Sequence, residues 1–300
     1  PPVAQRNQPH ALRFPYDQPL ALAAWRALYF RPAAFAPQPQ RSDDWNRGAY
    51  LVRGLGHCSA CHAPRNALGA TRNPLDLEGG MVPLRNWYAP ALNDGAEAGV
   101  ADWPLEEIVS LLRTGLAPRG AALGPMADVV RGSSQHWNAA DLRAVAIYLK
   151  ELPQRRDGVA ATATATTATT AATTAATTST TTAAASAEAT LTPGARLYER
   201  HCADCHGAQG QGKPPAYPAL AGNRTLTMES PVNLTRIVLG GAFAPSTAAN
   251  PRPYGMPPFA TVLSDAEIAS LLGHLRSSWG HNASQPSVLD VNRMRGGSAP

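Results

Sequence analysis

The chain of 300 residues is poor in cysteine, in aromatic residues and in charge, and each shortage excludes a class of protein. Four cysteines are too few to hold a chain of this length together by disulfides. Aromatic residues make up 6% and charged residues 16% of the chain, which argues against a strand-rich sandwich and against a highly charged disordered protein. No apolar run approaches the roughly 18–20 residues that cross a bilayer, so the sequence predicts no transmembrane span.

Lysine is nearly absent, because Lys150 and Lys213 are the only two lysines among 26 basic residues. The formal net charge is +5, and the arginines are spread evenly along the chain. Proteins that bind nucleic acid usually carry a basic stripe or patch, and this sequence has none. We therefore expect no nucleic-acid partner.

Alanine and threonine, by contrast, fill residues 158–190 almost completely. Such a segment has no apolar face whose burial could offset its ordering entropy, so it is predicted to be a flexible linker. It separates two units, residues 42–157 and 191–280. We expect residues 1–41 to form an N-terminal arm, with one helix that packs on the first unit or, as the alternative, serves as a docking or membrane-surface element. Residues 281–300 are expected to form a C-terminal tail that ends in a short helical turn.

The two units repeat one another through five landmarks in the same order. These are a Gly-Ala-x-Leu segment leading into Cys-x-x-Cys-His, a tyrosine followed by Pro-Ala-Leu, a short helix ended by glycine, a proline-flanked methionine and a closing helix. They lie at 48–62, 88–92, 106–115, 126 and 138–152 in the first unit, and at 194–206, 217–220, 233–240, 256 and 264–279 in the second. The sequence therefore predicts duplication of one small helical fold.

The Cys-x-x-Cys-His segments are the chemically informative feature of both units. Cysteines two apart can hold zinc, an iron–sulfur cluster, a redox disulfide or covalent haem. A zinc ribbon needs its two pairs within about 15–20 residues, whereas Cys61 and Cys202 lie on opposite sides of the alanine–threonine tract. An iron–sulfur cluster needs four thiolates, and a thioredoxin-like site needs a βαβ unit. Covalent haem, for which Cys-x-x-Cys-His is the attachment signature, is favoured over a zinc module.

The spacing has a physical reason. One helical turn presents both thiols to the two haem vinyl groups, and the next residue places an imidazole beneath the iron. We therefore expect two covalently bound haems c and, because such attachment implies export, a periplasmic protein. The predicted cofactor-binding residues are Cys58, Cys61, His62, Cys202, Cys205 and His206, with the two histidines as iron ligands.

A methionine thioether opposite the histidine raises the reduction potential for electron transfer. Met126 and Met256 follow the glycine-ended helix and precede the closing helix of their units, so we predict them as the sixth iron ligands. We also expect the carbonyls of Pro90 and Pro218 to accept the second N–H of the ligating imidazoles. The remaining methionines are expected to pack in the interior or lie at the surface: Met81, Met228 and Met294.

Residues 45–66 resemble the cytochrome c subunits of bacterial membrane-associated dehydrogenases, of the alcohol, gluconate and sorbitol types and of those paired with molybdenum hydroxylases. Residues 121–130 and 254–260 are similar to that family's axial-methionine loops, which supports Met126 and Met256. The resemblance implies an all-α fold, with two class I cytochrome c-type domains in tandem. The family typically has three haem domains, and the first residues here look like the connector after its first domain. We therefore expect either a fragment lacking that domain or a two-haem variant.

The resemblance also implies a function. Such subunits take electrons from a catalytic quinoprotein, flavoprotein or molybdenum hydroxylase and pass them to ubiquinone or to another cytochrome or oxidase. We expect no catalytic residues in this chain, and the resemblance allows peripheral contact with the outer face of the cytoplasmic membrane. The alternatives are a dihaem peroxidase or thiosulfate-oxidising cytochrome, which needs an exchangeable iron position, and a dihaem oxidase subunit, which normally carries a membrane anchor.

Overall fold

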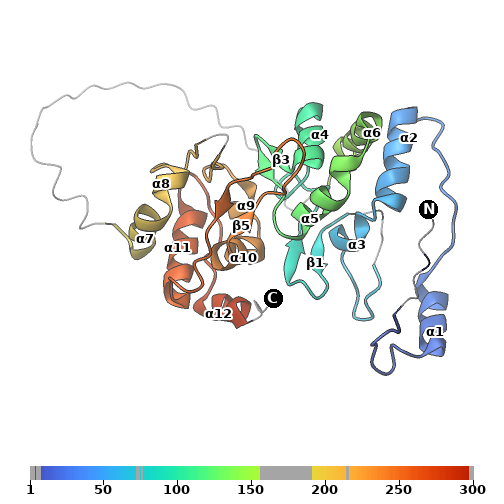
Figure 1. Ribbon diagram of the computed structural model, residues 1–300, viewed down its shortest axis with the longest axis horizontal. Helices are drawn as coiled ribbons and strands as arrows, with labels where there is room; N and C mark the ends of the chain where they lie inside the picture. The colour runs from blue at the N-terminus through green and yellow to red at the C-terminus, as the bar shows by residue number, and fades with distance from the viewer. Residues whose placement is uncertain are drawn as a thin grey trace, which may run out of the picture.

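The computed structural model describes residues 4, 8–71, 75, 77–155, 191–213 and 216–296, so the predicted linker at 158–190 lies outside the described residues. Helices dominate these ranges (Figure 1). The first part of the chain contains α1 (Pro19–Tyr29), α2 (Asp43–Tyr50), a π-helix (Leu51–Leu55), α3 (Ser59–His62), α4 (Leu105–Thr114), α5 (Pro125–Gly132), a 3₁₀ turn (Ser134–His136) and α6 (Ala139–Lys150). The second part contains α7 (Pro193–His201), α8 (Ala203–His206), α9 (Arg224–Thr227), α10 (Val232–Gly240), α11 (Asp265–Ser277) and α12 (Val288–Gly296).

Short antiparallel hairpins accompany the helices, which the expectation of an all-α fold did not include. In the described ranges they form three two-stranded sheets: β1 (Gly80–Val82) with β2 (Trp87–Ala89), β3 (Leu116–Ala117) with β4 (Gly120–Ala121), and β5 (Ala242–Phe243) with β6 (Gly255–Met256). The strands are two or three residues long, too short to produce a detectable alternation of apolar and polar residues. No helix in the described part of the chain is both long and apolar enough to cross a membrane.

Two separate hydrophobic cores occupy the described residues. In the first unit α2 crosses α6, and the rings of Trp45 and Tyr148 meet edge to face with centroids 5.2 Å apart. In the second unit α7 crosses α11 in the same way. The helices approach closely because each crossing has a glycine, since a Cβ on Gly48 would overlap the carbonyl oxygen of Ala144 and a Cβ on Gly194 would overlap that of Ser270. The matched Gly-Ala-x-Leu segments thus encode the same helix crossing twice.

The closing helices begin where the sequence predicts. Asn138 caps α6 by accepting a hydrogen bond from the backbone N–H of Asp141 at 2.8 Å. Ser264 and Glu267 form a reciprocal capping box at the start of α11. These side chains satisfy backbone donors that have no partner inside the helix, and so fix where each helix starts.

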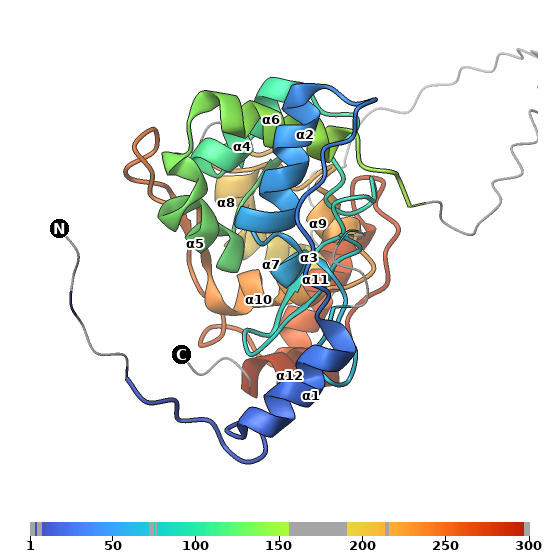
Figure 2. The same cartoon turned by 90° about the vertical axis from the view of Figure 1, so that its right-hand side faces the viewer.

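The two ends of the described chain differ from expectation in opposite ways. Helix α1 forms where the apolar residues and prolines predict it, yet it buries no side chain and lies at the edge of the molecule (Figures 1 and 2). A hydrogen bond from Trp25 Nε1 to the Leu68 carbonyl at 2.9 Å ties it to the first unit. At the other end, the expected short turn is the nine-residue helix α12, and its fully buried Val291 belongs to the second core.

Candidate functional site

The first Cys-x-x-Cys-His segment forms a single helical turn, with Cys58 at the N-cap of α3 and His62 at its last position. His62 Nδ1 lies 2.7 Å from the carbonyl oxygen of Pro90, which follows β2. A carbonyl can only accept, so Nδ1 carries the proton and donates. The unprotonated Nε2 is then the nitrogen available to bind a metal.

The second segment repeats this geometry on α8. Cys202 stands at the N-cap, and His206 Nδ1 lies 2.9 Å from the carbonyl oxygen of Pro218. The hydrogen bonds predicted for both prolines are therefore present. A fixed imidazole whose Nε2 is free, one turn from two thiols, is the donor set that covalent haem requires.

Electrostatics also distinguish these segments from redox-active dithiols. Burial raises the pKa of Cys58 and of Cys202 to about 11, so both thiols stay protonated near neutral pH. Redox-active cysteines instead have a lowered pKa, because the thiolate is the nucleophile. Burial lowers the pKa of His62 and of His206, with the two proline carbonyls opposing it, so each imidazole is held in the neutral form that ligates iron.

The donor groups also do not fit the zinc alternative. Among the residues that the structure describes, no group of three or more His, Cys, Asp or Glu side chains is arranged to hold a metal ion. All four cysteines are free thiols, available for thioether bonds. The side chains present thus suit attachment of a macrocycle that brings its own iron better than capture of a bare ion.

The methionines occupy different environments. Met126 stands in the first turn of α5 and Met256 in β6, and both side chains are partly buried. Met228 is buried in the second unit, and Met81 on β1 is half exposed. The two candidates for the sixth ligand, Met126 and Met256, are thus neither fully buried nor fully exposed to solvent.

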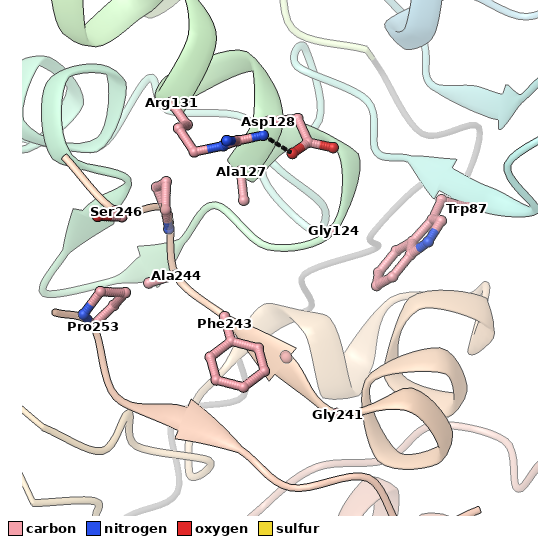
Figure 3. A pocket seen from close by; sticks show the side chains of 12 residues that line it. Trp87, Gly124, Ala127, Asp128, Arg131, Gly241, Phe243, Ala244, Ser246 and Pro253 are labelled. Carbon is pink, nitrogen blue, oxygen red and sulfur yellow. Dashed lines mark hydrogen bonds and ion pairs between the residues drawn. The ribbon is translucent and has the colours of Figure 1, made fainter. Parts of the chain in front are cut away.

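Residues beside both candidate methionines line one cavity of about 470 Å³ between the two units (Figure 3). Gly124 and Ala127, which flank Met126, form one wall, and Gly241 and Phe243 form the opposite wall. Met256 pairs with Ala242 between those two residues in the β5–β6 hairpin. The units therefore turn their methionine-bearing segments toward the same space.

Sequence reasoning missed the residues that join the units. Arg236 on α10 stacks on the ring of Trp87 at 5.3 Å, and Arg224 binds Asp102 at 3.1 Å. A charged residue inside an amphipathic helix is ordinary at the sequence level, so neither arginine stands out there. Trp87 directly precedes the Tyr-Ala-Pro-Ala-Leu landmark, and this position was the one sequence feature that could have drawn attention to it.

Comparison with known proteins gives one matching family model and three relatives. The family model "Cytochrome c" matches residues 191–279. Over its whole length the chain is 34% identical to the cytochrome c subunit of the quinone-type alcohol dehydrogenase of Gluconobacter oxydans, and it spans 61% of that protein. It is 32% identical to the cytochrome c subunit of gluconate 2-dehydrogenase of Pantoea cypripedii over 98% of this chain and 66% of the relative, and 34% identical to cytochrome c-552 of Thermus thermophilus over 29% of this chain and 68% of the relative.

Proposed function

Since the chain belongs to the cytochrome c family, we propose that it binds two haems c covalently and relays single electrons from a catalytic dehydrogenase subunit to an acceptor. The observation that carries this proposal is the repeated geometry of the two sites. In each unit a histidine that closes a Cys-x-x-Cys-His turn donates Nδ1–H to a proline carbonyl and keeps Nε2 free. A single site of this kind is compatible with several functions, whereas two matched haem sites in one chain suit the transfer of single electrons from one haem to the next.

The proposed domains are a first haem domain at 42–157 and a second at 191–280, joined by the linker at 158–190. When bound, haem supplies the one-electron chemistry, and this chain's residues attach it, orient it and restrict its access to water. The proline carbonyls hold the two ligating imidazoles, and Met126 and Met256 are the proposed sixth ligands, a pairing that raises the potential. The proposed attachment residues are Cys58, Cys61, Cys202 and Cys205.

The proposed donor is a dehydrogenase subunit, because relatives that align with nearly the whole chain are named as cytochrome c subunits of quinone-type alcohol dehydrogenase and of fructose dehydrogenase. The chain spans about 61% of the length of these relatives, and we therefore propose no particular substrate for the complex. We propose ubiquinone or another cytochrome or oxidase as the acceptor, and the periplasmic face of the cytoplasmic membrane as the location. The chain itself is proposed to have no catalytic residue.

Reduction of both haems through the copurified dehydrogenase tests the proposal. Addition of the dehydrogenase substrate under anaerobic conditions should reduce both haems, and addition of acceptor should reoxidise both. A dihaem peroxidase would instead turn over hydrogen peroxide, with one haem lacking the methionine–iron absorbance band. Peroxide turnover, or a haem that the substrate never reduces, would contradict the relay.

A further inference from the structure

The peptide group between Pro90 and Ala91 is hydrogen-bonded on both sides. Its carbonyl oxygen, which belongs to Pro90, accepts from His62 Nδ1 at 2.7 Å. Its N–H, which belongs to Ala91, donates to the carboxylate oxygen Oε2 of Glu97 at 2.6 Å. Ala91 is completely buried, so water does not compete for this N–H. One amide group therefore joins a carboxylate to the histidine that we propose as the iron ligand of the first unit.

A short loop brings Glu97 back to Ala91. The Asp94 carbonyl accepts from the backbone N–H groups of Glu97 at 3.1 Å and of Gly99 at 2.7 Å. The Ala91 carbonyl accepts from the backbone N–H of Ala98 at 3.1 Å. These backbone bonds hold the loop closed, so the place of the carboxylate does not depend on the conformation of one side chain alone.

Tyr88 and Gly79 complete the surroundings of the carboxylate. The hydroxyl of Tyr88 donates to Oε2 and Oε1 of Glu97, at 2.9 and 3.0 Å. Burial, together with the charge of Glu97, raises the pKa of Tyr88, so the hydroxyl keeps the proton that it donates. A Cβ on Gly79 would lie 2.7 Å from the Ala91 nitrogen and 2.8 Å from the Tyr88 hydroxyl. The glycine therefore leaves the space that these hydrogen bonds require.

The second unit has the same histidine contact without the carboxylate. His206 Nδ1 donates at 2.9 Å to the carbonyl of the peptide group whose N–H belongs to Ala219. Within the described ranges, no carboxylate accepts from that N–H. Six residues after Ala219 the chain has Thr225, whereas the first unit has Glu97 at the same spacing. The carboxylate thus distinguishes two sites that are otherwise built alike.

A charged acceptor on the N–H of an amide strengthens the carbonyl of that amide as an acceptor. Chains of hydrogen bonds polarise one another, by about 10–30% per bond, and bonds to a charged group are among the strongest. A stronger acceptor at Nδ1 makes the imidazole a more basic ligand through Nε2. A more basic ligand stabilises the oxidised, more positive iron over the reduced iron, and so lowers the reduction potential.

We propose that Glu97 is a positioning residue for the first haem, which acts through the Pro90–Ala91 peptide group on His62 and lowers the reduction potential of the iron that His62 binds. This inference rests on the proposed function. The carboxylate holds the peptide group in place and increases the electron density that the imidazole offers to the metal.

Potentiometric titration of the haem-loaded chain, in the wild type and in Glu97→Gln, tests the inference. Glutamine keeps an acceptor of nearly the same size and removes the charge, so the potential of the first haem should rise. The expected rise corresponds to at least about a threefold change in the reduction equilibrium, which is about 28 mV for one electron at about 59 mV per tenfold. The component of the first haem is the one that remains when Cys202→Ala is combined with Cys205→Ala.

Proton NMR of the reduced, diamagnetic chain gives a reading specific to the hydrogen bond. The Nδ1–H resonance of His62 should move upfield in Glu97→Gln, because a weaker hydrogen bond deshields the proton less. The Nδ1–H resonance of His206 should stay in place. Glu97→Asp, which keeps the charge but shortens the side chain by one methylene, should show both changes at a smaller size. It supplies the test if Glu97→Gln fails to take up haem.

Glu78→Gln is the matched control, because it removes the same charge from a neighbouring segment. Glu78 precedes Gly79, whose backbone N–H donates to the His62 carbonyl at 2.9 Å. Its removal should raise the potential of the first haem by less than half as much and leave the His62 Nδ1–H resonance in place.

Three results would overturn the inference: an unchanged potential in Glu97→Gln, an unmoved His62 resonance in that variant, or an equal rise of potential in Glu78→Gln. Fewer than two haems per wild-type chain would instead overturn the proposed function, so the two failures are distinguishable.

Discussion

The side chain of Asn233 holds the backbone of Tyr88 from both sides, accepting from its N–H at 3.0 Å and donating to its carbonyl at 2.7 Å. The two residues are 145 positions apart in the chain and belong to different units. An amide side chain here replaces the neighbour that a β-strand would provide, because it has one acceptor and one donor at the required spacing. Loss of these two hydrogen bonds should therefore lower the stability of both units.

Asn233→Ala should destabilise the haem-loaded chain by about 1–3 kcal/mol, because it removes two partly buried hydrogen bonds worth roughly 0.5–1.5 kcal/mol each. Denaturation in guanidinium chloride measures the change. Asn292→Ala is the control, because the exposed hydrogen bond that Asn292 donates to Asp265 at 2.8 Å stays within the second unit. Equal unfolding free energies for Asn233→Ala and the wild type would show that the units do not rely on this contact.

The glycines at the two helix crossings should tolerate no side chain. Gly48→Ala and Gly194→Ala force a Cβ against backbone carbonyls that cannot rotate away, so each should cost on the order of 3 kcal/mol. Gly132→Ala in α5 is the matched control, since a Cβ there meets nothing within 4 Å. It should be neutral or slightly stabilising, because alanine favours helix over glycine. Similar melting temperatures for all three variants would refute the close crossing.

The contact between Asp102 and Arg224 should weaken in acid. Burial works to raise the pKa of Asp102, but its hydrogen bonds to Arg224 and the charge of that arginine outweigh burial, so the pKa falls below its ordinary value of 3.8. The folded pKa is thus below the unfolded one. The stabilisation is therefore complete above about pH 5 and is lost as the pH falls through the folded value.

Unfolding midpoints measured between about pH 7 and pH 3 check this dependence in Asp102→Asn. The variant should be less stable than the wild type at neutral pH. Its stability should also fall less than that of the wild type as the pH is lowered. Asp128→Asn removes a carboxylate whose ion pair with Arg131 stays within the first unit. Asp128→Asn should therefore retain the loss of stability in acid that we attribute to Asp102. The same dependence of stability on pH in Asp102→Asn and the wild type would argue against attributing that loss to Asp102.

The two proposed sixth ligands have a spectroscopic test. Met126→Ala and Met256→Ala should each remove about half of the absorbance band that methionine–iron bonding produces in the oxidised protein, and should lower the potential of one haem. Met81→Leu, a substitution at the half-exposed methionine of β1, should preserve the full band. Retention of the whole band in Met126→Ala would assign the first sixth ligand to another residue.

The parts of this molecule that short motifs encode were predictable from the sequence. Each Cys-x-x-Cys-His turn is local, and the carbonyls of Pro90 and Pro218 could be matched to the histidines because the landmark order occurs twice. Contacts between the units carry no such signal. The stacking of Arg236 on Trp87 depends on how two separately folded cores dock, and helical periodicity describes only one element at a time.

Helix α1 also shows that a sequence pattern can predict an element without predicting its contacts. Its flanking prolines and apolar residues correctly predict a helix, but they do not specify a partner, and no side chain of α1 is buried. Periodicity reports that a face is apolar and leaves open which surface covers it. The two-residue strands of the β5–β6 hairpin, the second of which contains Met256, were likewise beyond prediction, since strands this short show no alternation of apolar and polar residues.

The number of haems bound per chain tests the central claim most directly. The alkaline pyridine haemochrome spectrum, together with the mass of the denatured chain, should give two haems c that remain attached after acid–acetone extraction. Cys58→Ala combined with Cys61→Ala should leave one, and so should Cys202→Ala combined with Cys205→Ala. A single haem in the wild type, or haem that extraction removes, would contradict the account of two matched attachment sites.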